Sequence, residues 1–299
     1  MPNSKSSVLI YNPKTGRYAN QRLPAIESVC AHLHDRGLEV ELLLTSGAGD
    51  ATRLAAKAAQ SGAQNLIIAG GDGTINEALQ GFVGTDLRLA ILPRGTANVL
   101  ARELELPLDI MKAADLILRG RTRRIHVGCA IDETSGTKRY FFLMAGIGLD
   151  ASVVRRVHPG LKKHFGKAAF WLSGLSHLAH WQPLPFNVRV NGQDYPATFA
   201  AIGKAASYGG DLAVTPRAQL ERPDFEICLI ESRSRLRYLR LLSFALRKGF
   251  PSDEAGVCFL HASEARALGS APVQVDGELV GNLPMRFEIA PESVDVIVP

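Results

Sequence analysis

The stretch Gly70-Gly71-Asp72-Gly73-Thr74-Ile75-Asn76-Glu77 lies between a predicted strand and a predicted helix. The apolar run before it, residues 65–69, is typical of a buried parallel strand. A glycine-rich turn at this place lets backbone N–H groups approach an anion, and the helix N-terminus adds unpaired donors. Asp72 adds a carboxylate that can hold Mg²⁺ or orient a polar group beside phosphates. A plain tight turn would need only the glycines, so the pattern favours a phosphate-binding loop.

Two common nucleotide-binding motifs do not fit this stretch. A P-loop needs a lysine after its glycines, and none follows here. A dinucleotide fingerprint needs a third glycine where this chain has Asn76. The loop therefore belongs to another class of phosphate-binding sequence.

The first part of the chain alternates predicted strands and helices around this loop. We expect strands at 8–12, 40–45, 65–69 and 87–92, with helical segments between and after them. This alternation predicts a parallel sheet with helices on both faces. Sites in such sheets lie beyond the carboxyl ends of the strands, which is where Thr45, residues 70–74 and Gly95-Thr96 fall.

The pattern changes near residue 121, where short predicted strands separated by turns begin and continue to residue 298. Among them are strands expected at 195–202, 257–268, 285–289 and 294–298. Such a pattern indicates an antiparallel sandwich or barrel. We therefore predict an α/β N-terminal domain with a parallel sheet over 1–122 and a mainly antiparallel β-sandwich C-terminal domain over 123–292.

Composition is that of an ordinary folded protein, with 46% hydrophobic and 21% charged residues and a net charge of +5. No window of about 18 apolar residues occurs, and the first residues lack the apolar region of a signal peptide. A cytoplasmic location is the resulting expectation. The four cysteines are widely spaced without a Cys-x-x-Cys pair, which argues against a zinc site or a disulfide scaffold.

Three separated motifs together resemble one family. Besides residues 70–77, they are Leu92-Pro93-Arg94-Gly95-Thr96-Ala97-Asn98 and Val275-Asp276-Gly277-Glu278, with Asn12-Pro13 near the start. Their order and span resemble the diacylglycerol kinase catalytic-domain superfamily, and within it the bacterial soluble lipid kinases of the YegS type. The fold implied is NAD kinase/diacylglycerol kinase-like, and the last strand, near 293–299, would return to the first domain. Val99 stands where many members carry aspartate.

The resemblance implies an ATP-dependent, Mg²⁺-dependent lipid kinase that phosphorylates a lipid hydroxyl, such as that of diacylglycerol. The N-terminal domain would bind the nucleotide. Thr45 could equally be a turn threonine on the residues alone, and the resemblance favours nucleotide contact. The predicted nucleotide-binding residues are Asn12, Thr45, Gly70, Gly71, Asp72, Gly73, Thr74, Ile75, Asn76, Glu77, Gly95 and Thr96.

The turn Asp276-Gly277-Glu278 is a routine hairpin signal by itself. The resemblance makes it the catalytic loop, with Glu278 as the first choice for the general base and Asp276 as the alternative or metal-side partner. A Mg²⁺ site implied by the resemblance would use the Asp224 carboxylate and the carbonyls of Glu221 and Glu226. A solvated turn is an equal alternative there.

Residues 232–252 contain six basic and no acidic side chains. At 100° per residue, Arg237, Arg240, Arg247 and Lys248 share one face of a helix, which suits an anionic membrane surface. Apolar residues of the helix share another face: Tyr238, Leu239, Leu242 and Leu246. A second acid-free basic run covers 155–167. We expect a lipid substrate at such a surface, peripheral membrane association and no nucleic-acid partner, with a homodimer left open.

Two alternatives remain open on the sequence. One is an NAD kinase or another small-molecule kinase that shares the glycine loop. The other is a nucleotide-binding regulator without catalysis, which Val99 leaves open. Labelled ATP offered with lipid and soluble acceptors separates these readings.

Overall fold

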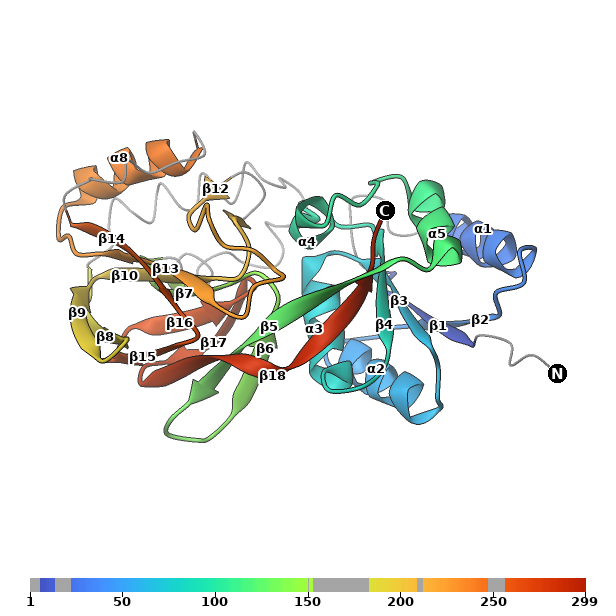
Figure 1. Ribbon diagram of the computed structural model, residues 1–299, viewed down its shortest axis with the longest axis horizontal. Helices are drawn as coiled ribbons and strands as arrows, with labels where there is room; N and C mark the ends of the chain where they lie inside the picture. Colours follow the sequence, from blue (N-terminus) through green and yellow to red (C-terminus); the bar gives the residue numbers. More distant parts are fainter. Residues whose placement is uncertain (1–5, 14–22, 150, 153–182, 209–211, 247–255) are drawn as a thin grey trace. The chain divides into compact units, whose positions relative to one another are not determined.

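The computed structural model describes residues 6–13, 23–149, 151–152, 183–208, 212–246 and 256–299. The chain forms two compact units (Figure 1). Unit 1 comprises Met1–Ile125 and Glu292–Pro299, and unit 2 comprises His126–Pro291. The basic run at 155–167, together with Arg247 and Lys248, lies outside the described residues.

Unit 1 contains a parallel sheet whose strand order is β2 (Val40–Leu44), β1 (Ser7–Tyr11), β3 (Asn65–Gly70) and β4 (Arg88–Pro93). Every residue of β1 and β3 is buried, as expected of continuous apolar runs in the middle of a parallel sheet. The end of β18 (Met285–Ile297) joins this sheet beside β4, where Val296 pairs with Leu89 in parallel (Figure 1).

Five helices accompany this sheet among the described residues of unit 1: α1 (Leu23–His34), α2 (Asp50–Gln60), α3 (Asp72–Phe82), α4 (Val99–Glu103) and α5 (Ile110–Arg119). Local chemistry sets their ends. The Asp109 carboxylate accepts the first free N–H groups of α5, and Gly120 ends that helix with a positive φ of 66°. Helices α2 and α3 touch at Gly81, where a Cβ would stand 2.0 Å from the Thr52 carbonyl oxygen.

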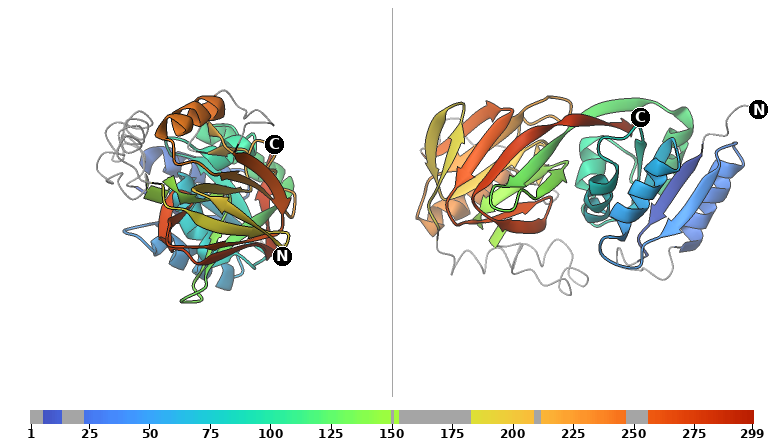
Figure 2. Two further views of the ribbon diagram at one scale, coloured as in Figure 1. Left: turned by 90° about the vertical axis from the view of Figure 1, so that its left-hand side faces the viewer. Right: turned by 90° about the horizontal axis from the view of Figure 1, so that it is seen from below.

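Unit 2 contains the antiparallel strands of a ten-stranded sheet that β18 shares with unit 1, and a separate six-stranded antiparallel sheet (Figure 2). The first comprises β5 (Thr122–Asp132), β6 (Lys138–Phe141), β18, β15 (Glu264–Leu268), β8 (Phe186–Val190) and β9 (Gln193–Ala197). The second has the order β14 (Val257–Ala262), β13 (Phe225–Ile230), β10 (Phe199–Gly203), β7 (Met144–Gly148), β16 (Pro272–Val275) and β17 (Glu278–Asn282). A two-stranded ribbon of β11 (Ser207–Tyr208) and β12 (Leu212–Ala213), and helix α8 (Arg235–Leu246), complete the described part.

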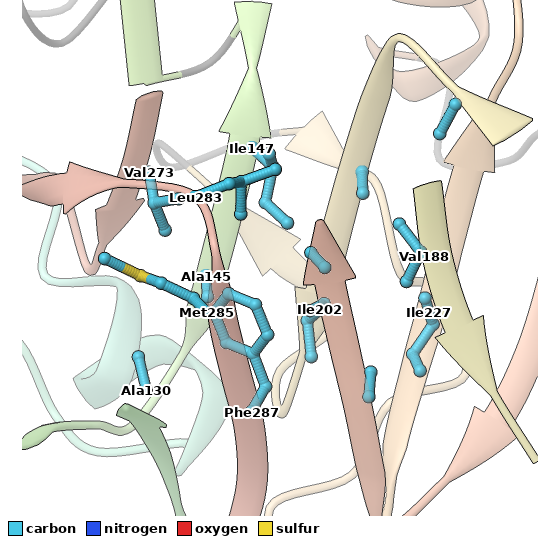
Figure 3. Close-up of a cluster of buried hydrophobic side chains, with 14 of the residues drawn as sticks. Ala130, Ala145, Ile147, Val188, Ile202, Ile227, Val273, Leu283, Met285 and Phe287 are labelled. Atoms are coloured by element: carbon cyan, nitrogen blue, oxygen red, sulfur yellow. The ribbon is translucent and has the colours of Figure 1, made fainter. Parts of the chain in front are cut away.

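The core of unit 2 lies between these two sheets. Figure 3 shows Val188, Met285 and Phe287 from the first sheet facing Ile147, Ile202 and Ile227 from the second. Strand β8 alternates buried and exposed residues, which is the pattern of a strand with one face on a core. The predicted class, an α/β domain with a parallel sheet followed by an antiparallel β domain, is confirmed.

Some predicted strands have different limits in the structure. The single strands expected at 195–202 and 257–268 are each two strands, because the chain leaves one sheet and enters the other at Thr198 and at Ser263. The strands expected at 285–289 and 294–298 are one continuous strand, β18. Residue patterns mark an extended chain but do not show to which sheet it pairs.

Candidate active site

The two glycine loops of unit 1, one after β3 and one after β4, contact each other through their backbones. A Cβ on Gly95 would stand 2.6 Å from the Cα of Gly71, and one on Gly71 would stand 3.0 Å from the Cα of Gly95. The N–H of Arg94 donates to the carbonyl oxygen of Gly70 over 2.9 Å. Two residues predicted to contact phosphate are thus also required to be glycine by packing.

Asn98 and Asp72 stabilise this pair of loops. Asn98 has a φ of 48°, accepts the Gly95 N–H at Oδ1 over 2.8 Å and donates from Nδ2 to the Gly95 carbonyl. Asp72, the first residue of α3, accepts the N–H of Leu100 at Oδ1 over 3.1 Å. Its carboxylate therefore links the start of α3 to the first turn of α4. Val99 is buried in unit 1.

Thr74 lies inside unit 1 rather than on the surface of the loop. Its N–H donates to the Gly71 carbonyl over 2.9 Å, and its hydroxyl accepts the Asn12 amide over 3.2 Å. Ile75 and Asn76 are buried as well. Thr74 and Asn12, both predicted to bind nucleotide, therefore lie together. The Thr74 N–H and hydroxyl form hydrogen bonds within the protein.

Glu77 supports the neighbouring helix. Its carboxylate accepts the N–H of Ala51 at the start of α2 over 2.9 Å, and its carbonyl accepts the Thr52 hydroxyl. By contrast, Gly73 and Thr96 are exposed, and open space surrounds the position of a Cβ on Gly73. Within the predicted set, these two residues offer the most accessible surface.

Thr45 follows β2 and is buried, with its N–H donating to the Tyr11 carbonyl over 3.0 Å. The loop after it is closed by Asp50, whose carboxylate accepts the N–H groups of Ser46 and Gly47 and the Ser46 hydroxyl. These hydrogen bonds, that of the Ser46 hydroxyl first, hold the pKa of Asp50 well below its usual range. The loop is thus ordered by its own side chains.

In unit 2, the turn between β16 and β17 consists of Asp276 and Gly277, which have φ values of 45° and 83°. The Asp276 carboxylate accepts three successive backbone N–H groups, from Phe142 at 2.9 Å and from Leu143 and Met144 at 3.0 Å. The Asp276 N–H donates to the Met144 carbonyl over 2.9 Å. This carboxylate fixes the turn against the start of β7 and the two residues before it.

Glu278 is the next carboxylate and begins β17, with 43% of its side chain exposed. It forms an ion pair with Arg139 of β6. The sequence did not indicate a role for Arg139, because no motif surrounds it and Glu278 lies 139 residues further along the chain. The buried Gln274 also supports the turn by accepting the Gly277 N–H over 2.7 Å.

The metal site predicted in unit 2 would use the Asp224 carboxylate with the backbone carbonyls of Glu221 and Glu226. Asp224 forms a two-pronged pair with Arg222, and the buried Glu226 pairs with Arg217 at 3.2 Å. Glu221 is exposed. Over the described residues, no three His, Cys, Asp or Glu side chains gather closely enough to hold a metal ion.

A cation nevertheless lies at this loop, since the Lys204 ammonium donates to the carbonyls of Gln219, Arg222 and Asp224. Burial lowers the pKa of Lys204 to about 8, against the raising effect of the Asp224 and Glu221 charges. The sequence signal of Lys204 is a lone lysine that ends the apolar run 199–203.

Helix α8 presents a face that differs from the predicted one. Tyr238, expected beside Leu239 on the apolar face, is 4% exposed and its hydroxyl lies 2.7 Å from the Thr198 hydroxyl. Leu236 and Leu239 are instead 77% and 41% exposed. No helix in the described part of the chain is long and apolar enough to cross a membrane.

Comparison with known proteins gives the class. Residues 6–130 match the family model of the diacylglycerol kinase catalytic domain, and residues 144–298 match that of the YegS C-terminal NAD kinase beta sandwich-like domain. A diacylglycerol kinase of Mycobacterium tuberculosis (strain CDC 1551 / Oshkosh) is 31% identical over 96% of this chain and 93% of its own. One of Bacillus subtilis (strain 168) is 30% identical over 99% and 97%.

A crystal structure of a diacylglycerol kinase from Bacillus anthracis str. Sterne shares the fold, with a TM-score of 0.78 and 24% identity over 100% of this chain and 99% of that one. The family model and the curated relatives place the protein in the lipid kinase class. The chain belongs to the diacylglycerol kinase family with a YegS-type C-terminal domain.

Proposed function

We propose that this chain is an ATP- and Mg²⁺-dependent lipid kinase that transfers the γ-phosphoryl group to the hydroxyl of a diacylglycerol-like lipid. Family membership supports the class of reaction. The roles of the two carboxylates are assigned from their different contacts in the turn of unit 2. Asp276 accepts three backbone N–H groups, whereas Glu278 has a half-exposed side chain whose carboxylate is paired with Arg139.

Unit 1 would hold the nucleotide. No side chain of the described residues caps the N-terminus of α3, and Gly73 leaves the approach to its first turn open. Thr96 adds an exposed hydroxyl on the adjoining loop. The Asp72 carboxylate at the same helix end is an oxygen ligand of the kind that Mg²⁺ prefers, so the residues fit a metal–nucleotide complex. The bound Mg²⁺ would neutralise charge on the phosphates.

Glu278 would act as the general base that accepts the proton of the lipid hydroxyl. Arg139 holds the Glu278 carboxylate in one orientation through their ion pair. Asp276 would position the turn, because its own oxygens are taken by the backbone of residues 142–144. The contacts of the two carboxylates therefore favour Glu278 over Asp276 as the general base.

We also propose that α8 contacts an anionic membrane at the cytoplasmic face, as a peripheral protein would. Leu236, Leu239 and Arg240 are exposed at a spacing of three and four residues, so they form one stripe. Exposed leucines beside a basic residue suit an interfacial helix. Nucleic acid is not proposed as a partner, and a homodimer remains a prediction.

The acceptor is tested with labelled ATP and a panel of diacylglycerol, monoacylglycerol, ceramide, sphingosine, phosphatidylglycerol and NAD. We expect Mg²⁺-dependent label transfer to diacylglycerol or a close relative and none to NAD. Transfer to NAD alone would move the chain to the small-molecule kinases. Nucleotide binding without transfer to any acceptor would favour the regulator.

Membrane contact is tested by sedimentation with vesicles that contain phosphatidylglycerol. Leu236→Ser with Leu239→Ser removes apolar area that an interface would bury, so bound protein should fall several-fold. The matched control is Leu44→Ser with Leu108→Ser, two exposed leucines of unit 1. Equal sedimentation of both double variants and the parent would contradict the proposal for α8.

A further inference from the structure

Lys204 is a lysine with 0% exposure in the interior of unit 2. It directly follows β10, and its N–H donates to the Leu143 carbonyl over 2.8 Å. A buried ammonium is strongly destabilising unless it is paired and fully hydrogen-bonded. The surroundings of this side chain must therefore supply the acceptors that water would otherwise provide.

Three backbone carbonyls of one loop meet the ammonium. They belong to Gln219 and Asp224, each at 3.1 Å from Nζ, and to Arg222. An ammonium has three N–H donors and no acceptor, so this set of three oxygens satisfies it. The carbonyls of residues 219, 222 and 224 thus converge on one cation that is part of the chain.

A divalent metal ion does not fit the same residues. Mg²⁺ needs oxygen atoms at about 2.0–2.1 Å and Ca²⁺ at about 2.3–2.6 Å, and the point of convergence is filled by Nζ. The Asp224 carboxylate, the side chain expected to bind the metal, is held by Arg222 through contacts of 3.1 and 2.6 Å. The charge that a metal would neutralise is already neutralised by protein cations.

We propose that the Lys204 ammonium is the resident cation of the loop at 219–224 and takes the place of a divalent metal ion there. Unit 2 then folds and keeps this loop in place without bound metal. The Mg²⁺ that would accompany ATP in unit 1 is a separate requirement. The inference does not depend on which acceptor is phosphorylated.

The position of Lys204 connects this loop to the candidate catalytic turn. The Leu143 carbonyl accepts the N–H groups of Lys204 and Ala205, and the Leu143 N–H donates to Asp276. One backbone residue therefore joins the cation-bound loop to the turn. Loss of the ammonium should first destabilise the loop at 219–224. The turn at Asp276 should then be destabilised through Leu143, which contacts both.

The first test uses the parent protein without nucleotide. Its thermal midpoint is measured after EDTA treatment and again with millimolar Mg²⁺ or Ca²⁺, and metal binding to unit 2 is measured by dialysis on Asp224→Asn and parent. We expect midpoints within about 1 °C of each other and equal metal uptake by both proteins. An EDTA-induced fall that Mg²⁺ reverses, and that Asp224→Asn does not show, would overturn the proposal.

The second test removes the ammonium. Lys204→Ala should lower the midpoint by roughly 5–15 °C, while the matched control Lys138→Ala, an exposed lysine of unit 2, should change it little. Propylammonium is the fragment that Lys204→Ala lacks, so it should recover part of the loss, whereas propanol should not. If Lys204→Ala is as stable as Lys138→Ala, the proposed role of the Lys204 ammonium is contradicted. If Lys204→Ala does not fold, the metal test on the parent protein decides whether a metal is needed.

Discussion

The glycine loops of unit 1 and the carboxylate turn of unit 2 are fixed by opposite means. In unit 1, Gly71 and Gly95 bring two backbones to a distance at which any Cβ would clash. In unit 2, one side chain, Asp276, holds a segment of backbone through three N–H groups. The first region depends on the absence of side-chain atoms, and the second depends on a charge.

This difference determines which substitutions reveal function. Adding one carbon atom should damage the loops of unit 1, whereas the turn of unit 2 should respond to the loss of a carboxylate. Each region also contains a residue that serves as a control. Gly73 has open space around it, and the Glu278 carboxylate pairs with Arg139 rather than with the backbone segment that Asp276 holds. Four variants test the comparison.

Glu278→Gln should have the largest effect. The amide keeps the size of the side chain and a hydrogen bond to Arg139, but it cannot take a proton, so the chemical step should slow by roughly 10²–10⁴-fold. Nucleotide affinity and the thermal midpoint should stay near those of the parent. Single-turnover phosphorylation of a lipid acceptor, run beside ATP binding, measures both. A parent-like rate would remove Glu278 as the base.

Asp276→Asn should act on stability as well as on rate. The carboxylate accepts N–H groups at both oxygens, and an amide would point a donor at one of them, at a cost of about 2–3 kcal/mol in the free energy of unfolding. Urea unfolding measures this loss. Parent-like stability combined with lost transfer would instead make Asp276 the reacting carboxylate.

Gly95→Ala should lower the free energy of unfolding by about 1–3 kcal/mol, because its Cβ would stand 2.6 Å from Gly71 and 2.8 Å from the Asn98 amide oxygen. ATP affinity should fall with it, since both loops must shift. Calorimetric unfolding and nucleotide titration check the two effects. An unchanged stability would show that the two loops do not need their close backbone contact.

Gly73→Ala should have the smallest effect on stability, below about 1 kcal/mol and in the stabilising direction, because alanine favours the helix and meets no atom within 4 Å. If phosphates approach this backbone, ATP affinity should still fall. Affinity equal to the parent would place the nucleotide away from Gly73. Gly95→Ala and Gly73→Ala therefore separate packing from ligand contact.

Much of the fold could be predicted because its signals are local. Apolar runs gave β1, β3 and β4, and the alternation of strand and helix gave the parallel sheet. The places where the chain changes sheets, Thr198 and Ser263, could not be predicted. Pairing across a sandwich depends on residues distant in sequence, and a strand that changes partners keeps its extended pattern.

The candidate site shows the same limit. Glycine motifs identified the loops of unit 1, but not that Thr74 and Glu77 bind other parts of that unit. The turn at 276–278 was found from its residues, whereas the pairing of Glu278 with Arg139 was not. Both depend on long-range contacts, which a single sequence does not record. The expected metal residues at 221–226 were placed without Lys204, whose role also requires a contact across the fold.

Strand β18 has a consequence for the order in which the protein is made. It ends in unit 1, yet residues 126–291, all of unit 2, are synthesised before Glu292–Pro299. During translation, β4 therefore lacks its neighbour β18 until residues 126–291 have been synthesised. Because this contact spans about 200 residues, it should form late. Until then the first unit exposes an unpaired sheet edge at β4, which is the kind of surface that chaperones protect.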